Sequence, residues 1–68
     1  MKYIVKLTMD DPRLTGPHYI APPLSGADYV STEEKAMRYS SLEKAKLLCN
    51  FALRAWPVKE AIVMGVEK

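Results

Sequence analysis

The chain has 68 residues, of which 49% are hydrophobic and 26% charged, and its net charge is +2. This length allows a single domain, residues 1–68, and the composition is that of a folded globular protein rather than a disordered one. One cysteine, Cys49, and one histidine, His18, exclude an internal disulfide and the zinc sites that need several such ligands. We therefore expect no cofactor and no metal, and a small core that would gain from oligomerisation or from a partner.

The sequence also bears on location. No apolar run reaches the roughly 20 residues that cross a membrane. The first residues, MKYIVKLTMDD, lack the long apolar stretch of a signal peptide. Together with the unpaired cysteine, these features predict a cytoplasmic protein that does not associate with a membrane.

Residues 2–9, KYIVKLTM, alternate with a period of two. Tyr3, Val5 and Leu7 point to one face, whereas Lys2 and its alternate neighbours point to the other. This period, with its β-branched and aromatic residues, predicts a half-buried strand. The following Asp-Asp-Pro ends it, because proline cannot donate to the ladder.

The segment from about residue 10 to 28 holds four of the five prolines and two of the three glycines. It predicts a long loop with a short extended piece near residues 18–21. Loops of this length are often binding elements, but a proline-stiffened connection without a function explains the composition equally well. Within it, Arg13, His18 and Tyr19 are the candidates for contact with a protein partner, because Tyr and Arg are enriched in interface hot spots.

The helix-start motif Ser-x-x-Glu occurs twice between residues 31 and 50. A single helix over residues 32–56 would place two charged side chains, Lys35 and Arg38, in the middle of its apolar stripe, where charges are costly. We therefore expect the first motif to form a turn or one capped helical turn, and residues 36–39 to form a short strand.

The second motif is predicted to start the main helix, over about residues 41–56. Ser40 is the expected N-cap, with Glu43 reaching back to its amide, and Pro57 ends the helix. The expected core stripe of this helix consists of Leu42, Ala45, Cys49, Ala52, Leu53 and Trp56.

Residues 58–66 are apolar on both faces around Val63, which predicts a more central strand. The elements then follow the order β–loop–(β)–β–α–β. The expected fold is α+β, with one helix packed on a small, mostly antiparallel sheet.

Two apolar side chains of the helix, Leu47 and Phe51, point away from its core stripe. Either the proline-rich loop covers them, or they face a second chain in a homodimer or in a complex with another protein. With Arg54 they are the predicted partner-binding residues of the helix.

The sequence contains no catalytic motif, and Cys49 lies on the core side of the helix, so we expect a protein that is not an enzyme. A nucleic-acid-binding or nucleotide-sequestering protein is one alternative, supported only by scattered basic residues that glutamates dilute. A purely homo-oligomeric structural subunit is another.

The run KAMRYSSLEKAKLLC, followed by EAIVMGVEK, resembles a pattern found in small bacteriophage-type and mobile-element proteins of unknown function. Where their role is known, such proteins often inhibit host or defence complexes by binding, as anti-CRISPR proteins do. The resemblance implies an inhibitor of a bacterial defence or host complex, acting in the host-cell cytoplasm. We therefore expect a non-catalytic protein-binding module.

Overall fold

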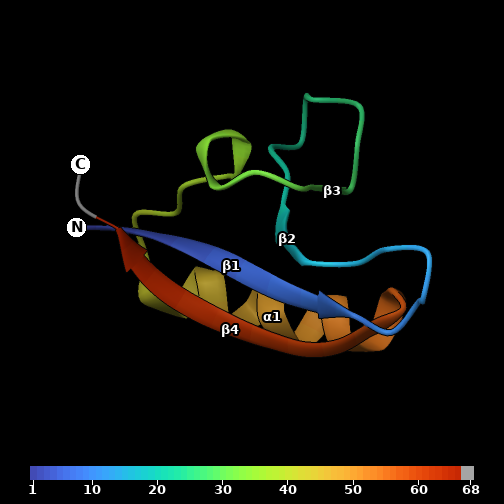
Figure 1. Ribbon diagram of the computed structural model, residues 1–68. Coiled ribbons are helices and arrows are strands. Elements are labelled where there is room, and N and C mark those ends of the chain that lie inside the picture. The colour runs from blue at the N-terminus through green and yellow to red at the C-terminus, as the bar shows by residue number, and fades with distance from the viewer. Residues whose placement is uncertain (67–68) are drawn as a thin grey trace.

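The computed structural model describes residues 1–66. In chain order its elements are β1 (Lys2–Met9), β2 (Pro17–Ile20), β3 (Tyr29–Val30), the 3-10 helix η1 (Glu33–Lys35), α1 (Leu42–Ala55) and β4 (Val58–Val66). The four strands form one antiparallel sheet in the order β3-β2-β1-β4, and α1 packs on β1 and β4 (Figure 1). The α+β class and the single long helix are therefore confirmed.

β1 lies in the middle of the sheet and is buried on both faces. Val5 and Leu7 are fully buried on the face that α1 covers. Ile4 is equally buried but points to the opposite face. The strand is therefore a two-sided core strand, where the sequence pattern indicated burial of one face.

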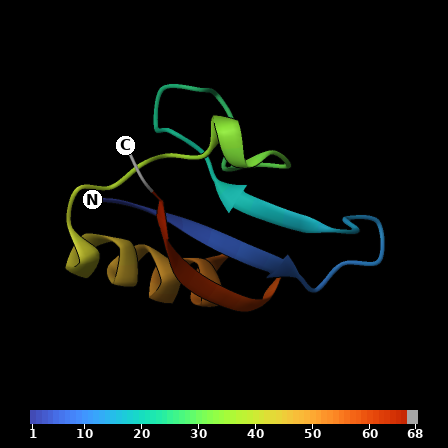
Figure 2. The ribbon, with the colours of Figure 1, turned by 60° about the vertical axis from the view of Figure 1, so that its left-hand side comes forward.

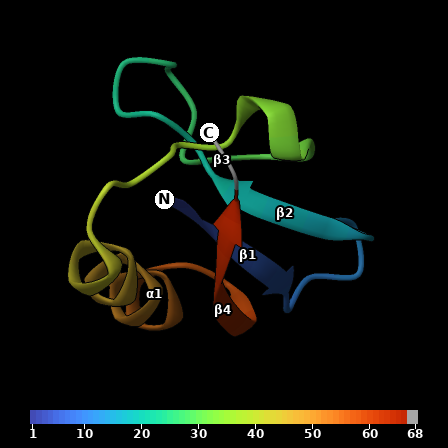
Figure 3. The same ribbon diagram turned by 90° about the vertical axis from the view of Figure 1, so that its left-hand side faces the viewer.

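A second, smaller core covers the face of the sheet opposite α1. The chain from β3 through η1 brings Ala36 against Ile4 and Tyr19. Figure 3 shows η1 and α1 on opposite sides of the strands. The partly buried side chains of Val30, Met64 and Val66 complete this core. Of the two forms expected for the first Ser-x-x-Glu motif, the structure has the helical turn, a short 3-10 helix without a side-chain cap, which serves as the second cover.

β4 is an edge strand, so the prediction of a central strand was wrong. It pairs with β1 alone, from Lys2 opposite Val66 to Met9 opposite Val58. It is apolar on both faces because α1 covers one face and the second core the other. Partial cover on both faces, with Val58 buried and Ala61, Val63, Met64 and Val66 half-buried, explains its composition without a central place in the sheet.

Residues 36–39 do not form the expected strand. Where β2 has ended, Tyr39 takes its place beside β1 in a single bridge to Tyr3. The amide of Tyr3 donates to the carbonyl of Tyr39 at 2.8 Å, and the amide of Tyr39 donates back at 2.7 Å. The amide of Met37 instead donates to the carbonyl of Ile20 at 2.9 Å, which ties this segment to the end of β2.

β2 divides the proline-rich segment into two connections, residues 10–16 and 21–28 (Figure 2). The second is closed by a hydrogen bond from the amide of Ala21 to the carbonyl of Asp28, at 3.0 Å. Gly26 turns this connection with a φ of 82°, a value that favours glycine. The expected extended piece is therefore a strand, and the loop is shorter than the sequence indicated.

α1 begins one residue later than predicted. Ser41, not Ser40, is the N-cap, and its hydroxyl accepts a hydrogen bond from the amide of Lys44 at 3.2 Å. Glu43 then lies one position too early for a reciprocal capping box. Within the described residues, no helix is long and apolar enough to cross a membrane.

The two adjacent serines provide a direct test of this cap. We expect Ser41→Ala to lower the free energy of unfolding by about 0.5–2 kcal/mol, because the amide of Lys44 loses its acceptor. Ser40→Ala is the matched control and should change it by less than about 0.5 kcal/mol. Urea unfolding followed by circular dichroism measures both. Equal losses in the two variants, or a larger loss at Ser40, would contradict the assignment.

Candidate protein-binding surface on the helix

The face of α1 that meets the sheet is built from small side chains. Ala45, Cys49 and Ala52 are its buried residues. Two members of the expected core stripe, Leu42 and Leu53, are instead 40% and 44% exposed. Small side chains let the helix lie close to the sheet, which leaves these leucines on its flank. Leu48, absent from the expected stripe, packs against the core.

Leu47 and Phe51 lie on the solvent side of α1, as the sequence indicated. They are 66% and 52% exposed. The proline-rich connections therefore do not cover them. Cover by the loop, one of the two interpretations left open by the sequence, is therefore not found, and contact with a second chain stays a prediction.

A row of four aromatic rings runs from the sheet to this surface. His18 on β2 meets Tyr29 on β3 edge-on, with ring centroids 5.8 Å apart. Tyr29 meets Trp56 at 5.6 Å, and Trp56 meets Phe51 at 5.5 Å. Edge-to-face pairs of this kind add about 0.5–1.5 kcal/mol each beyond the burial of their area. The row therefore holds the C-terminal end of α1 against β2 and β3.

Beside this row, a groove of about 290 Å³ separates α1 from the 21–28 connection. It arises because the single helix packs on β1 and β4 and leaves the β2 side of the same sheet face without a helix. Its only charged lining residues are Lys44 and Asp28. The remaining lining residues are Ile20, Ala21, Pro23, Ala27, Met37, Tyr39, Leu48, Phe51 and Trp56.

A second hollow, of about 470 Å³, lies on the outer side of the helix and shares Phe51 with the groove. Its other lining residues are Leu47, Asn50, Arg54 and Ala55. The apolar surface is thus continuous from the groove across Phe51 to Leu47. We call this area, made by Leu47, Leu48, Phe51, Arg54 and Trp56, the Phe51 surface.

The predicted residues of the proline-rich segment do not join the Phe51 surface as exposed groups. His18 is buried, and its Nδ1 lies 3.2 Å from the carbonyl oxygen of Gly16. Tyr19 is buried in the second core, on the opposite face of the sheet. Burial therefore leaves neither side chain free for a partner. Of the six predicted residues, the structure brings together Leu47, Phe51 and Arg54.

Arg13 is exposed but already has a partner in the chain. Its Nη2 forms an ion pair with Oδ2 of Asp11 at 3.1 Å, and its Nε donates to Oδ1 at 3.2 Å. The hydrogen bond from the Arg13 side chain lowers the pKa of Asp11. Arg13 lines neither the groove nor the outer hollow. This pair shapes the 10–16 connection.

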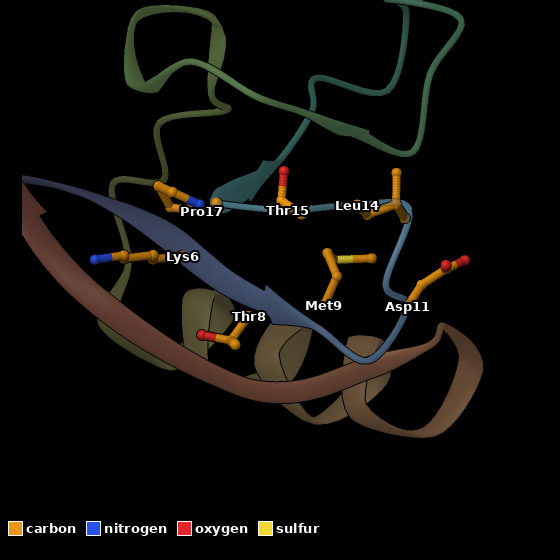
Figure 4. A pocket seen from close by; sticks show the side chains of 8 residues that line it. Lys6, Thr8, Met9, Asp11, Leu14, Thr15 and Pro17 are labelled. Carbon is orange, nitrogen blue, oxygen red and sulfur yellow. The ribbon is translucent and has the colours of Figure 1, made fainter.

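Another hollow, of about 480 Å³, lies under the 10–16 connection (Figure 4). Its polar groups do not converge, since the side chains of Lys6 and Asp11 point apart. The Asp11 carboxylate is moreover held by Arg13. No cluster of three or more His, Cys, Asp or Glu residues suited to a metal ion occurs in residues 1–66.

The basic residues proposed for nucleic acid fall into two groups on different faces. Lys2 and Lys6 lie on the sheet face opposite α1, in register with Val66 and Ile62 of β4. Lys44, Lys46 and Arg54 lie on α1. The structure therefore does not gather them into one basic patch.

The chain matches no protein-family model, no curated protein and no solved structure. Its function therefore has to be inferred from the described residues alone. The sequence indicated the exposed side of α1, through the phase of Leu47 and Phe51. It did not indicate the groove, which depends on where the 21–28 connection lies relative to the helix.

Cys49 and Tyr39 are buried on the helix side of the sheet. Burial raises the pKa of the Cys49 thiol, which keeps it protonated and a poor nucleophile near neutral pH. Burial also raises the pKa of Tyr39, with a smaller contribution from the nearby Cys49. Both groups therefore act as neutral core residues.

These shifts predict a loss of stability in alkaline solution. The folded chain keeps the Cys49 proton to a higher pH than the unfolded chain does. Its contribution is therefore complete below the ordinary pKa of 9.0 and is lost as the pH rises through the folded value.

We expect the free energy of unfolding of the wild type to fall above this pH more steeply than that of Cys49→Ala, which has no thiol to ionise. Urea unfolding of both proteins, in steps between about pH 7 and pH 11, measures the difference. Parallel curves for the two proteins would show that Cys49 is not buried as described.

Proposed function

We propose that this chain is a non-catalytic protein-binding module whose Phe51 surface receives an apolar segment of another protein, flanked by acidic residues. The observation that supports the proposal is the exposure of Leu47 and Phe51 directly beside a formed apolar groove. An apolar area continuous with a concave site is typical of interaction surfaces on small proteins.

The size of the groove favours side chains of a protein segment over a whole cofactor. Its volume of about 290 Å³ lies at the lower end of the range for small-molecule pockets. A groove of this size accommodates one or two large apolar side chains. Aromatic residues such as Phe51 and Trp56, at its rim and in its lining, belong to the types that dominate interface energetics.

The charges around Phe51 favour an acidic partner. Lys44 lines the groove and Arg54 lines the outer hollow, so a cation lies on either side of Phe51. Asp28 is the one acidic residue among the linings of the two hollows. Charges at the rim of an interface mainly steer association and select partners, so acidic groups beside the apolar anchor would be attracted.

The groove is formed before any partner arrives. The aromatic row holds the end of α1, and the two prolines Pro22 and Pro23 restrict the connection on the other side. A site that is already ordered costs less conformational entropy on binding. This lowers the free-energy cost of a complex for a surface of modest area.

A more specific function, inhibition of a bacterial defence or host complex, rests on the resemblance of the sequence to bacteriophage-type and mobile-element proteins and stays a prediction. A homodimer through Leu47 and Phe51, nucleic-acid binding and a purely structural role also stay predictions. No contact among residues 1–66 favours one of these over the binding of an acidic, apolar segment.

A peptide-display experiment tests the proposal with random peptides in place of a natural partner. The peptides are selected on the immobilised chain, and binding is then measured in solution by the fluorescence of Trp56, the one tryptophan, which lines the groove. We expect enriched peptides to combine one or two large apolar residues with neighbouring Asp or Glu. We expect Phe51→Ala to weaken their binding at least about tenfold, or about 1.4 kcal/mol.

A pair of charge reversals separates the Phe51 surface from general electrostatics. Lys44→Glu, in the groove, should weaken the selected peptides, and the weakening should shrink in high salt. Lys59→Glu, an exposed residue of β4, changes the net charge equally and should leave binding almost unchanged. Equal effects of the two reversals, or selected peptides without acidic residues, would count against the proposed partner chemistry.

A further inference from the structure

The outer edge of β4 offers unpaired backbone groups. Tyr3 exchanges both of its backbone hydrogen bonds with Tyr39, on the β2 side of β1. Residues of an antiparallel ladder alternate in the side to which they direct these groups. Tyr3, Val5 and Leu7 therefore direct their backbone groups toward β2, and the β4 residues opposite them direct their N–H and C=O groups away from β1. These β4 residues are Ala61, Val63 and Gly65, and their outward groups have no partner among residues 1–66.

Apolar side chains flank this edge on both faces of the sheet. Ile62 is 47% exposed on the face opposite α1. On the other face, the helical phase places Leu42 and Leu53 on the flank of α1 opposite to Leu48 and Phe51, which line the groove. That flank lies on the β4 side of the helix, and its two leucines are partly exposed. The edge is therefore an apolar strip with a row of hydrogen-bonding groups in its middle.

From Ala61 to Val66, the edge also lacks the features that keep sheet edges apart, which β4 carries only at its start, at Lys59 and Glu60. Edge strands of monomers usually carry a proline, a charge within the strand or a bulge, or are very short. β4 has nine residues, and the run from Ala61 to Val66 contains no charge and no proline. Its single irregularity lies near its start, opposite Thr8 and Met9.

We propose that β4 pairs in antiparallel fashion with β4 of a second copy of this chain, and so joins two sheets into one of eight strands. Pairing centred on Ile62 would place Ile62 beside its own copy and Ala61 opposite Val63. The overlap would be regular from Glu60 to Met64 and less regular at its ends, because β4 has a bulge at Lys59. In this register Lys59 would face Gly65 and Glu60 would face Met64, so no like charges would oppose each other. Leu42 and Leu53 of both helices would be brought toward the twofold axis.

The area that this side of the molecule can offer reaches the lower limit for a specific dimer. Nine strand residues span about 30 Å at about 3.3 Å each, and the molecule is about 20 Å thick. One edge with its flanks therefore offers at most about 600 Å² and the pair at most about 1,200 Å², at the lower limit of specific interfaces. The small core of a chain of 68 residues adds a reason for association, because the dimer buries apolar surface that the single chain leaves in water.

Amide hydrogen exchange and light scattering test the pairing on the full chain. At protein concentrations up to about 1 mM, we expect twice the chain mass and slow exchange at Ala61, Val63 and Gly65. Ile62 and Met64, whose amides face β1, are the internal reference for slow exchange. On dilution the mass should halve, and exchange at the three outward amides should accelerate at least tenfold relative to that reference.

Two variants and one control assign the interface. Ile62→Lys places a charge at the centre of the pairing, and Ala61→Pro removes an outward N–H while leaving the ladder to β1 intact. Each should weaken self-association at least tenfold and retain the circular dichroism of the wild type. Leu47→Lys, on the Phe51 surface, is the matched control and should leave the dimer unchanged while it weakens the selected peptides.

The same measurements can overturn the inference. A single-chain mass at every concentration, with fast exchange at the outward amides, excludes the dimer. The edge of β4 would then be open for pairing with a strand of another protein. A dimer that Leu47→Lys dissociates and Ile62→Lys does not would assign self-association to the helix instead. Because peptide binding and self-association are read separately, failure of one proposal is distinguishable from failure of the other.

Discussion

With Ile4 buried on one face of β1 and Val5 and Leu7 buried on the other, this strand needs a cover on each side. A chain of 68 residues has little material for two covers. It uses its one long helix on the first face and the short segment through η1, ending at Ala36, on the second. Both covers are narrower than a sheet of four strands. The two-sided burial of β1 therefore determines which parts of the molecule remain open.

The position of α1 follows from its own small side chains, and it determines which part of the sheet the helix leaves uncovered. Ala45, Cys49 and Ala52 bring the helix close to β1 and β4, which leaves the β2 side of that sheet face without a helical cover. The 21–28 connection and the aromatic row border this area without filling it. The open groove and the exposure of Phe51 therefore both result from the close packing of α1 on β1 and β4. The unpaired edge of β4 is the corresponding result at the other side of the sheet.

Local signals in the sequence predicted the elements well and their arrangement less well. The strand at residues 2–9, the exposure of Leu47 and Phe51, and the end of the helix before Pro57 were each predicted from short segments and confirmed, whereas the burial of β1 on both faces was not predicted. The misplaced N-cap shows the limit of local signals, because Ser40 and Ser41 satisfy the same preference and the motif does not distinguish them. The place of β4 in the sheet and the groove depend on contacts between segments distant in sequence, which no local pattern contains. The same holds for the burial of His18 and Tyr19.

The two open surfaces lie on opposite flanks of α1, so occupation of one does not block the other. The groove side of the helix, with Leu48 and Phe51, faces β2, whereas Leu42 and Leu53 lie toward the edge of β4. A dimer joined through β4 would therefore carry two Phe51 surfaces, both directed away from the twofold axis. Two modest sites on one rigid body bind a partner with repeated segments far more tightly than either site alone, because the second contact forms at a high effective concentration. Pairing through the edge, as proposed, would thus raise the affinity for such a partner above that of a single Phe51 surface.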